Sequence, residues 1–241
     1  MPPDHTIATT REALRRAAGA LAVLGVPSAR QDALDLLAVG AGWKPVAVLG
    51  RFIDDPAWLA GAEAVARRLG LTAWTGACWH PAPAPDALPD WYLAATAARD
   101  DALYVWRDAA IGARVQALCG HGRVTIADEA ALLFYPRCCV AQHHAQTLAL
   151  EQLIVALITR LVGDDRARGT RLVASGALPT PRTSDDWQRW EAAHAIAPEP
   201  GTPVNRCTAC GADPHGPAAR LGARYRDLAR LVGYGDLAVA A

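Results

Sequence analysis

The chain has little of what electrostatic binding or membrane insertion requires. Lys44 is the only lysine among 24 basic residues, and 24 acidic residues bring the formal charge to zero. Because a neutral chain has no excess positive charge to attract phosphates, we expect no nucleic-acid partner. No run of about 18 uncharged apolar residues occurs. Even 147–162 contains Glu151 and Arg160, so we expect no membrane span.

Three motifs that would name an enzyme class are also missing. The chain has no phosphate-binding loop of the G-x-x-x-x-G-K type, no G-x-S-x-G nucleophile elbow and no H-E-x-x-H zinc helix. The eight tryptophans are numerous, and several fall between 74 and 106. They either line a pocket for a small, flat or apolar substrate or serve as core aromatics.

The composition supports a buried, mainly helical core. Hydrophobic residues make up 52% of the 241 residues and charged residues 20%. Apolar spacing of three and four residues predicts helices throughout 6–70 and again at 90–98, 125–134, 138–162, 184–196 and 220–232. Strands are expected only at 71–75, at 103–106 (alternatively the start of a helix) and at 172–174 within a turn-rich 166–178. The sequence therefore predicts a mainly α fold with a few short strands.

Proline content and residue chemistry suggest three regions. We expect a helical N-terminal region at 1–75, a proline-rich linker or loop at 76–89 and a Cys/His-rich metal-site domain at 90–241. Arg15 and Arg16 before the apolar run 17–26 could belong to a weak signal peptide, but an amphipathic helix is the better interpretation. We therefore expect a cytoplasmic protein, where clustered cysteines indicate metal or redox chemistry rather than disulfides.

The sharpest local signal is Cys207-x-x-Cys210-Gly211. Two intervening residues let both sulfurs face one ion while backbone N–H groups in the turn bond to sulfur, and we expect Gly211 to ease the turn with a positive φ. This spacing is typical of half a zinc ribbon or one arm of an iron–sulfur site. A redox dithiol and an incidental pair are the alternatives.

The second signal is the adjacent pair Cys138-Cys139. Pro136 ends the preceding helix, so the pair is expected at the start of the next helix, where free N–H groups favour thiolate. Adjacent helical side chains diverge by about 100°, so we expect one cysteine as ligand or nucleophile and the other in the core. His143, four residues after Cys139, is the expected second ligand or catalytic partner, whereas His144 is expected to face elsewhere.

Two C-x-H segments are weaker candidates. Cys119-Gly120-His121 lies in a glycine-rich turn that suits close approach to an ion, and Cys78-Trp79-His80 opens the proline-rich stretch. The alternative for each is an ordinary buried cysteine.

Two short stretches are similar to organomercurial lyases: the adjacent cysteines, and the run Leu103-Tyr104-Val105-Trp106. The resemblance implies a catalytic cysteine directly after such a run, and Arg107 stands at that position here. The sequence therefore assigns the chain to no known family.

Together these patterns predict a cytoplasmic metalloprotein, an iron–sulfur enzyme acting on a small molecule by sulfur-handling, lyase or redox chemistry. Cys207 and Cys210 supply two ligands and Cys138 or Cys139 a third, and Cys119, His121 or His143 completes the site. One alternative is a zinc-stabilised binding module with an arginine-bearing surface. Another is a metal-free thiol enzyme with Cys138 or Cys139 as nucleophile and His143 or His144 as base. The sequence does not indicate an oligomeric state.

Overall fold

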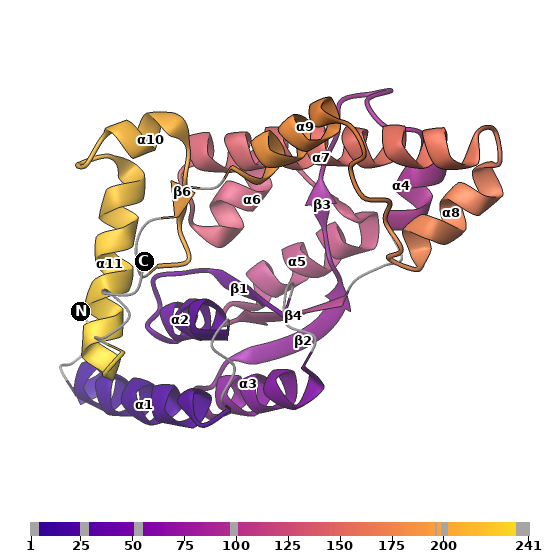
Figure 1. The fold of residues 1–241 in the computed structure, drawn as a ribbon. Helices are drawn as coiled ribbons and strands as arrows, with labels where there is room; N and C mark the ends of the chain where they lie inside the picture. Colours follow the sequence, from indigo (N-terminus) through magenta and orange to yellow (C-terminus); the bar gives the residue numbers. More distant parts are fainter. Residues whose placement is uncertain are drawn as a thin grey trace.

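The computed structural model describes residues 5–24, 29–50, 55–96, 101–195, 197–198 and 202–234. Within these residues the chain is mainly helical, with a few short strands, as the sequence predicts (Figure 1). The helices are α1 (His5–Ala22), α2 (Ala29–Gly40), α3 (Pro56–Arg68), α4 (Asp90–Thr96), α5 (Ala109–His121), α6 (Ile126–Leu133), α7 (Arg137–Val162), α8 (Arg166–Ala174), α9 (Ser184–His194), α10 (Thr208–Ala212) and α11 (Pro217–Val232). The strands are β1 (Val46–Leu49), β2 (Thr72–Ala77), β3 (His80–Pro81), β4 (Asp101–Trp106), β5 (Arg123–Val124), β6 (Ala197–Pro198) and β7 (Asn205–Arg206).

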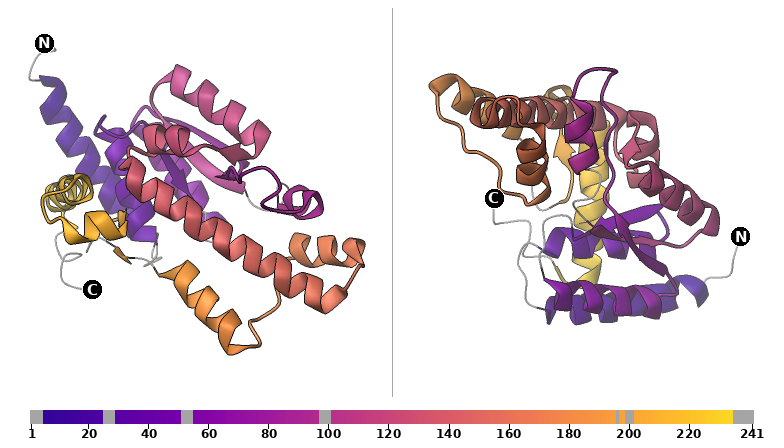
Figure 2. Two further views of the ribbon diagram at one scale, coloured as in Figure 1. Left: turned by 90° about the horizontal axis from the view of Figure 1, so that it is seen from above. Right: turned by 90° about the vertical axis from the view of Figure 1, so that its right-hand side faces the viewer.

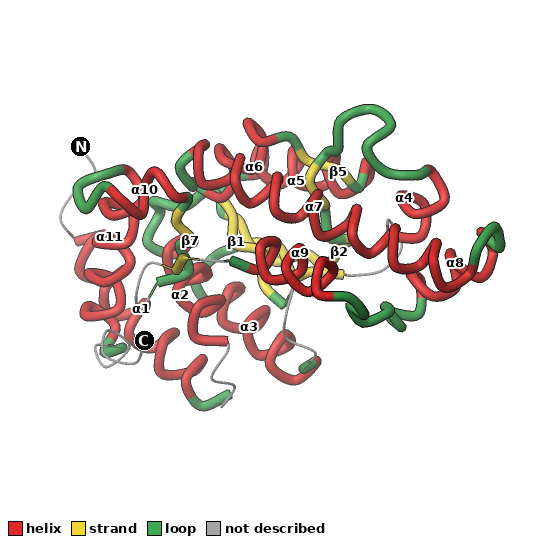
Figure 3. The backbone as a smooth tube through the Cα atoms, turned by 45° about the horizontal axis from the view of Figure 1, so that its top comes forward, coloured by secondary structure: helices red, strands yellow, loops and turns green. Residues whose placement is uncertain are grey.

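A three-stranded antiparallel sheet in the order β1-β4-β2 organises the first part of the chain. Side chains on the central strand β4 alternate between two cores, because successive strand residues point to opposite faces. Leu103 and Val105 pack with α2 and α3, while Tyr104 and Trp106 pack with α5. Figure 3 shows the sheet between these helices.

Two expectations about secondary structure are wrong. Residues 6–70 are not helical throughout, because Val46–Leu49 forms β1. A run of four apolar residues carries no helical or strand period of its own, and pairing with the distant β4 decides its conformation. The turn-rich stretch 166–178, with its expected strand, instead begins with α8. The Asp165 side chain caps α8, and Gly169 and Val173 are buried where α8 meets α4 and α7.

The proline-rich segment lies against the rest of the fold. His80–Pro81 pairs in parallel with β5, and the Ala82 N–H donates to the Val124 carbonyl at 2.9 Å. This anchors the first part of the segment beside α7, which β3 contacts.

The long helix α7 runs along one side of the molecule, from α10 at one end to α8 at the other (Figures 1 and 2). Among the described residues it is the one helix whose length and composition would allow it to cross a membrane. The core helix of a soluble protein can meet the same criterion, and α7 packs against α6, α8 and α9, with 28% of its apolar window buried. Its buried residues include the ionisable His144 and Glu151.

The last helix, α11, returns to the N-terminal helices. It packs against α1 and α2, and one hydrophobic cluster contains side chains from α1, α2, α3 and α11. Two hydrogen bonds reinforce this contact: Arg15 Nε donates to the Leu231 carbonyl and Tyr234 Oη to the Ala18 carbonyl, both at 2.8 Å. The two ends of the described chain therefore share one core.

The single lysine is the polar centre of this contact. Lys44 Nζ lies 2.6 Å from Asp35 Oδ2, with the lysine side chain fully buried, and donates to Tyr225 Oη at 3.2 Å. Tyr225 in turn donates to Asp35, and the ring of Tyr135 lies 4.7 Å from the ammonium. Burial lowers the pKa of Lys44, while Asp35 favours its charged form. A buried charge of this kind depends on its partner.

Replacing this lysine tests that dependence. Lys44→Met should destabilise the protein by about 3–5 kcal/mol, because it leaves Asp35 as an uncompensated buried charge. Urea unfolding measures the change. Arg230→Met is the matched control, since its ion pair with Asp227 is exposed on both sides and should contribute no more than about 1 kcal/mol. Equal losses in the two variants would contradict the assigned role of Lys44.

Candidate metal centre

The first two cysteines of the site lie in the first turn of α7. Phe134 ends α6 in the left-handed conformation with φ 60°, and Pro136 occupies the N-cap position of α7. Cys138 and Cys139 are consequently the second and third residues of the helix. The expectation that Pro136 separates two helices and places the pair at a helix start is confirmed.

The second pair lies on a short segment between β7 and α11. Cys207 is the N-cap of α10, and its Sγ accepts the Cys210 N–H at 3.4 Å, as expected for a metal-binding turn. Gly211 continues α10 and has no positive φ, so our expectation for that glycine is wrong. The turn is made instead by the helical residues between the two cysteines.

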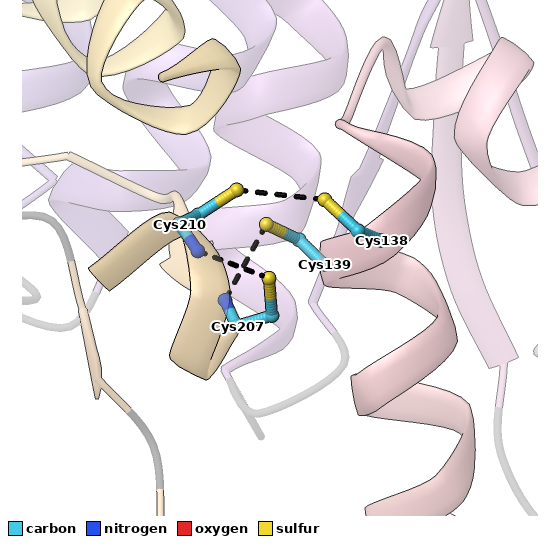
Figure 4. Close-up of side chains that lie close together, drawn as sticks. All are labelled: Cys138, Cys139, Cys207 and Cys210. Atoms are coloured by element: carbon cyan, nitrogen blue, oxygen red, sulfur yellow. Dashed lines mark hydrogen bonds between the residues drawn. The ribbon is translucent and has the colours of Figure 1, made fainter. Parts of the chain in front are cut away.

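The structure brings all four cysteines together. The Sγ atoms of Cys138, Cys139, Cys207 and Cys210 all lie within 4.8 Å of one another (Figure 4). Cys138 Sγ and Cys210 Sγ lie 3.4 Å apart, and the Cys207 N–H donates to Cys139 Sγ at 3.4 Å. Three of the cysteines are buried and Cys138 is exposed, and none forms a disulfide. Such a group of sulfurs can hold a metal.

Both adjacent cysteines belong to this group, although the sequence analysis expects only one. Figure 4 shows the side chains of both Cys138 and Cys139 pointing toward the Cys207–Cys210 turn. The turn therefore meets the two diverging side chains at once.

Three helix N-termini meet at the sulfurs. Cys138 and Cys139 lie in the first turn of α7, Cys207 caps α10, and the Ala218 N–H in the first turn of α11 bonds to the Cys210 sulfur. Free N–H groups and the positive ends of helix dipoles stabilise negative charge. The backbone thus compensates part of the charge that four thiolates would carry.

The thiols of Cys139, Cys207 and Cys210 differ in pKa. Burial raises the pKa of Cys139, and it raises that of Cys210 to about 11. At Cys207 burial also opposes ionisation, but the Cys210 N–H and the neighbouring thiols outweigh it and lower the pKa. The group therefore holds protons that a binding cation has to displace.

A residue that the sequence analysis does not name helps to position the turn. Gln142 Oε1 accepts the Thr208 N–H at 2.9 Å and the Thr208 hydroxyl at 3.2 Å. Gln142 lies four residues after Cys138, so the signal was helical spacing from the cysteine pair. Its amide fixes the start of α10 against the face of α7 that carries the cysteines.

The remaining candidates lie elsewhere. His143 is exposed on α7, one turn beyond the sulfurs, and is not among the clustered ligand atoms. Cys119 is buried in the core between α5 and the sheet, where burial raises its pKa, and Cys78 lies in the same cluster. His121 is exposed at the end of α5, and His80 is half-buried in β3. His144, expected to face elsewhere than the cysteine pair, is buried and bonded to Glu129, and it is not among the clustered ligand atoms.

Comparison of the chain with known protein families, with curated proteins and with solved structures gave no match. What the site does must therefore be argued from its own geometry.

Replacing two neighbouring residues of α7 separately, each by alanine, distinguishes a residue that positions the cysteine turn from a metal ligand. Gln142→Ala should weaken binding of Zn²⁺, used as a probe, by about 10-fold, because Thr208 loses its acceptor and the turn its fixed position. His143→Ala should leave the affinity unchanged. Competition with a chromophoric chelator measures both variants. A loss confined to His143→Ala would mean that His143 is a ligand after all.

Proposed function

We propose that the four cysteines bind a single Zn²⁺ ion that stabilises the fold. The observation that supports this is the compactness of the group, with all four Sγ atoms within 4.8 Å of one another. Ligands 2.3 Å from a tetrahedral zinc lie about 3.8 Å apart, so little adjustment is needed. An iron–sulfur cubane binds each cysteine to a different iron and spreads the sulfurs further apart. The geometry therefore favours one ion over a cluster.

The proposed site has a structural rather than a catalytic character. Four thiolates complete the coordination of a tetrahedral zinc ion and leave no position open for substrate. The ligands come from α7 and from the segment leading into α11, and α11 packs on α1 and α2. The ion would thus hold the start of α7 to the core shared by the two ends of the chain.

Metal analysis and unfolding test this proposal together. Protein purified without oxygen should be colourless and contain about one zinc and no iron or sulfide per chain. Because binding energy at a structural site is folding energy, chelation should lower the thermal midpoint substantially. Replacing zinc with Co²⁺ should give the intense visible absorption of a tetrahedral thiolate complex.

Cysteine variants supply the control. Cys207→Ala combined with Cys210→Ala should abolish zinc binding, whereas Cys119→Ala, at a buried cysteine outside the group, should retain full zinc content and lose about 1–2 kcal/mol at most. A brown protein with about four irons per chain would contradict the zinc proposal and indicate an iron–sulfur cluster. Unchanged stability in chelator would instead favour the metal-free thiol enzyme.

A further inference from the structure

A second site lies further along α7, away from the cysteines. A cavity of about 410 Å³ opens between the proline-rich segment, the start of α6 and one face of α7. Most of its wall is apolar, from Pro81, Pro83, Ile126 and Leu148. Its polar wall includes two ionisable side chains of α7, His144 and Glu151. A mostly apolar cavity with a few convergent polar groups is the usual form of a small-molecule site.

His144 is held in one orientation by a buried carboxylate. Its Nε2 lies 2.5 Å from Glu129 Oε2. Both residues are buried, with 7% of His144 and 2% of Glu129 exposed to solvent. The other oxygen of Glu129 accepts the indole N–H of Trp79 at 3.4 Å. Within the described part of the chain, His144 Nδ1 makes no hydrogen bond, and this atom is not completely shielded from solvent. Nδ1 is thus the ring nitrogen available to a ligand.

A carboxylate behind an imidazole has a defined chemical consequence. Accepting the Nε2–H fixes the ring tautomer in which Nδ1 carries the lone pair and faces away from the carboxylate.

Glu151, the other ionisable side chain of the cavity wall, does not oppose a negative charge that develops on a bound molecule. Glu151 lies 3.7 Å from Arg123 Nη1, and Arg123 also donates to the Pro81 carbonyl and to Thr96. Burial raises the pKa of Glu151, although the guanidinium acts in the opposite direction. The groups around the cavity therefore carry little net negative charge beyond the Glu129 that faces the imidazole.

We propose that His144, oriented by Glu129, is a general base in a cavity for a small, largely apolar molecule bearing an acidic hydroxyl. In the step, the substrate O–H bond breaks and an Nδ1–H bond forms, leaving an oxyanion beside the imidazolium. Glu129 remains ionised and keeps its hydrogen bond to Nε2–H. No oxidant, reductant or metal takes part, so this site is independent of the proposed zinc.

The probe that reports this step directly is 4-nitrophenol, because only its anion is yellow. At a pH about one unit below the phenol's own pKa, free probe is mostly neutral. Binding to the cavity should raise the phenolate fraction of the bound probe several-fold, measured by absorbance. Equilibrium dialysis measures binding separately from ionisation.

Variants of this face of α7 assign the effect. His144→Gln should retain most of the binding but return the bound probe to about the phenolate fraction of the free probe, and Glu129→Gln should lower that fraction by a smaller amount. His143→Gln, at the exposed neighbouring histidine, should behave as wild type. Ala145→Leu, at an exposed residue of the cavity wall, should weaken binding without unfolding the chain.

Three results would each overturn the proposal: no binding of the probe, binding without ionisation, or equal ionisation in wild type and His144→Gln. Zinc content and thermal midpoint, measured on the same samples, show whether a variant has lost the fold rather than the base.

Discussion

The structure depends on how four sulfurs can be brought within 4.8 Å of one another without a prohibitive electrostatic cost. Four thiolates at such distances would repel, and burial of three of them would add a desolvation penalty, which is why Cys139 and Cys210 have raised pKa values. Backbone N–H groups offset part of this cost: those of Cys207 and Cys210 donate to sulfurs of the group, and the Ala218 N–H at the start of α11 bonds to the Cys210 sulfur. A divalent cation would balance most of the remaining charge. The four sulfurs are therefore arranged so that they could hold a metal.

This contact also fixes the rest of the molecule. The sulfur group joins the start of α7 to α10, α10 leads into α11, and α11 packs on α1 and α2 over the buried pair Lys44–Asp35. Because α7 is one continuous helix, anchoring its first turn also fixes its rotation about its axis. Cys138, Cys139 and Gln142 then face the cysteine turn, whereas His144, Leu148 and Glu151 line the second cavity.

The local signals could be predicted from the sequence, and the long-range contacts could not. The C-x-x-C spacing and the proline before Cys138 both identify cysteines that belong to the observed group. Each of these signals is local, because it involves only residues that are close together in the sequence. The contact between the two pairs spans 72 residues, and no local pattern specifies it. For this reason the sequence analysis leaves Cys119, His121 and His143 as candidates for the remaining ligand. Strand β1 was not predicted for the same reason, since its conformation depends on its pairing with the distant strand β4.

α7 carries residues of two separate candidate sites, whereas the sequence analysis placed its candidate residues in one site. With a zinc ion bound as proposed, four thiolates would offer a substrate neither an open coordination position nor a free base. The base proposed above therefore lies at a different place on the helix. Five residues beyond Cys139, the same helix presents an imidazole with a buried carboxylate behind it, in a cavity with apolar walls. His144 seemed unremarkable in sequence because its partner, Glu129, lies on another helix 15 residues away and only the packing of α6 on α7 joins them.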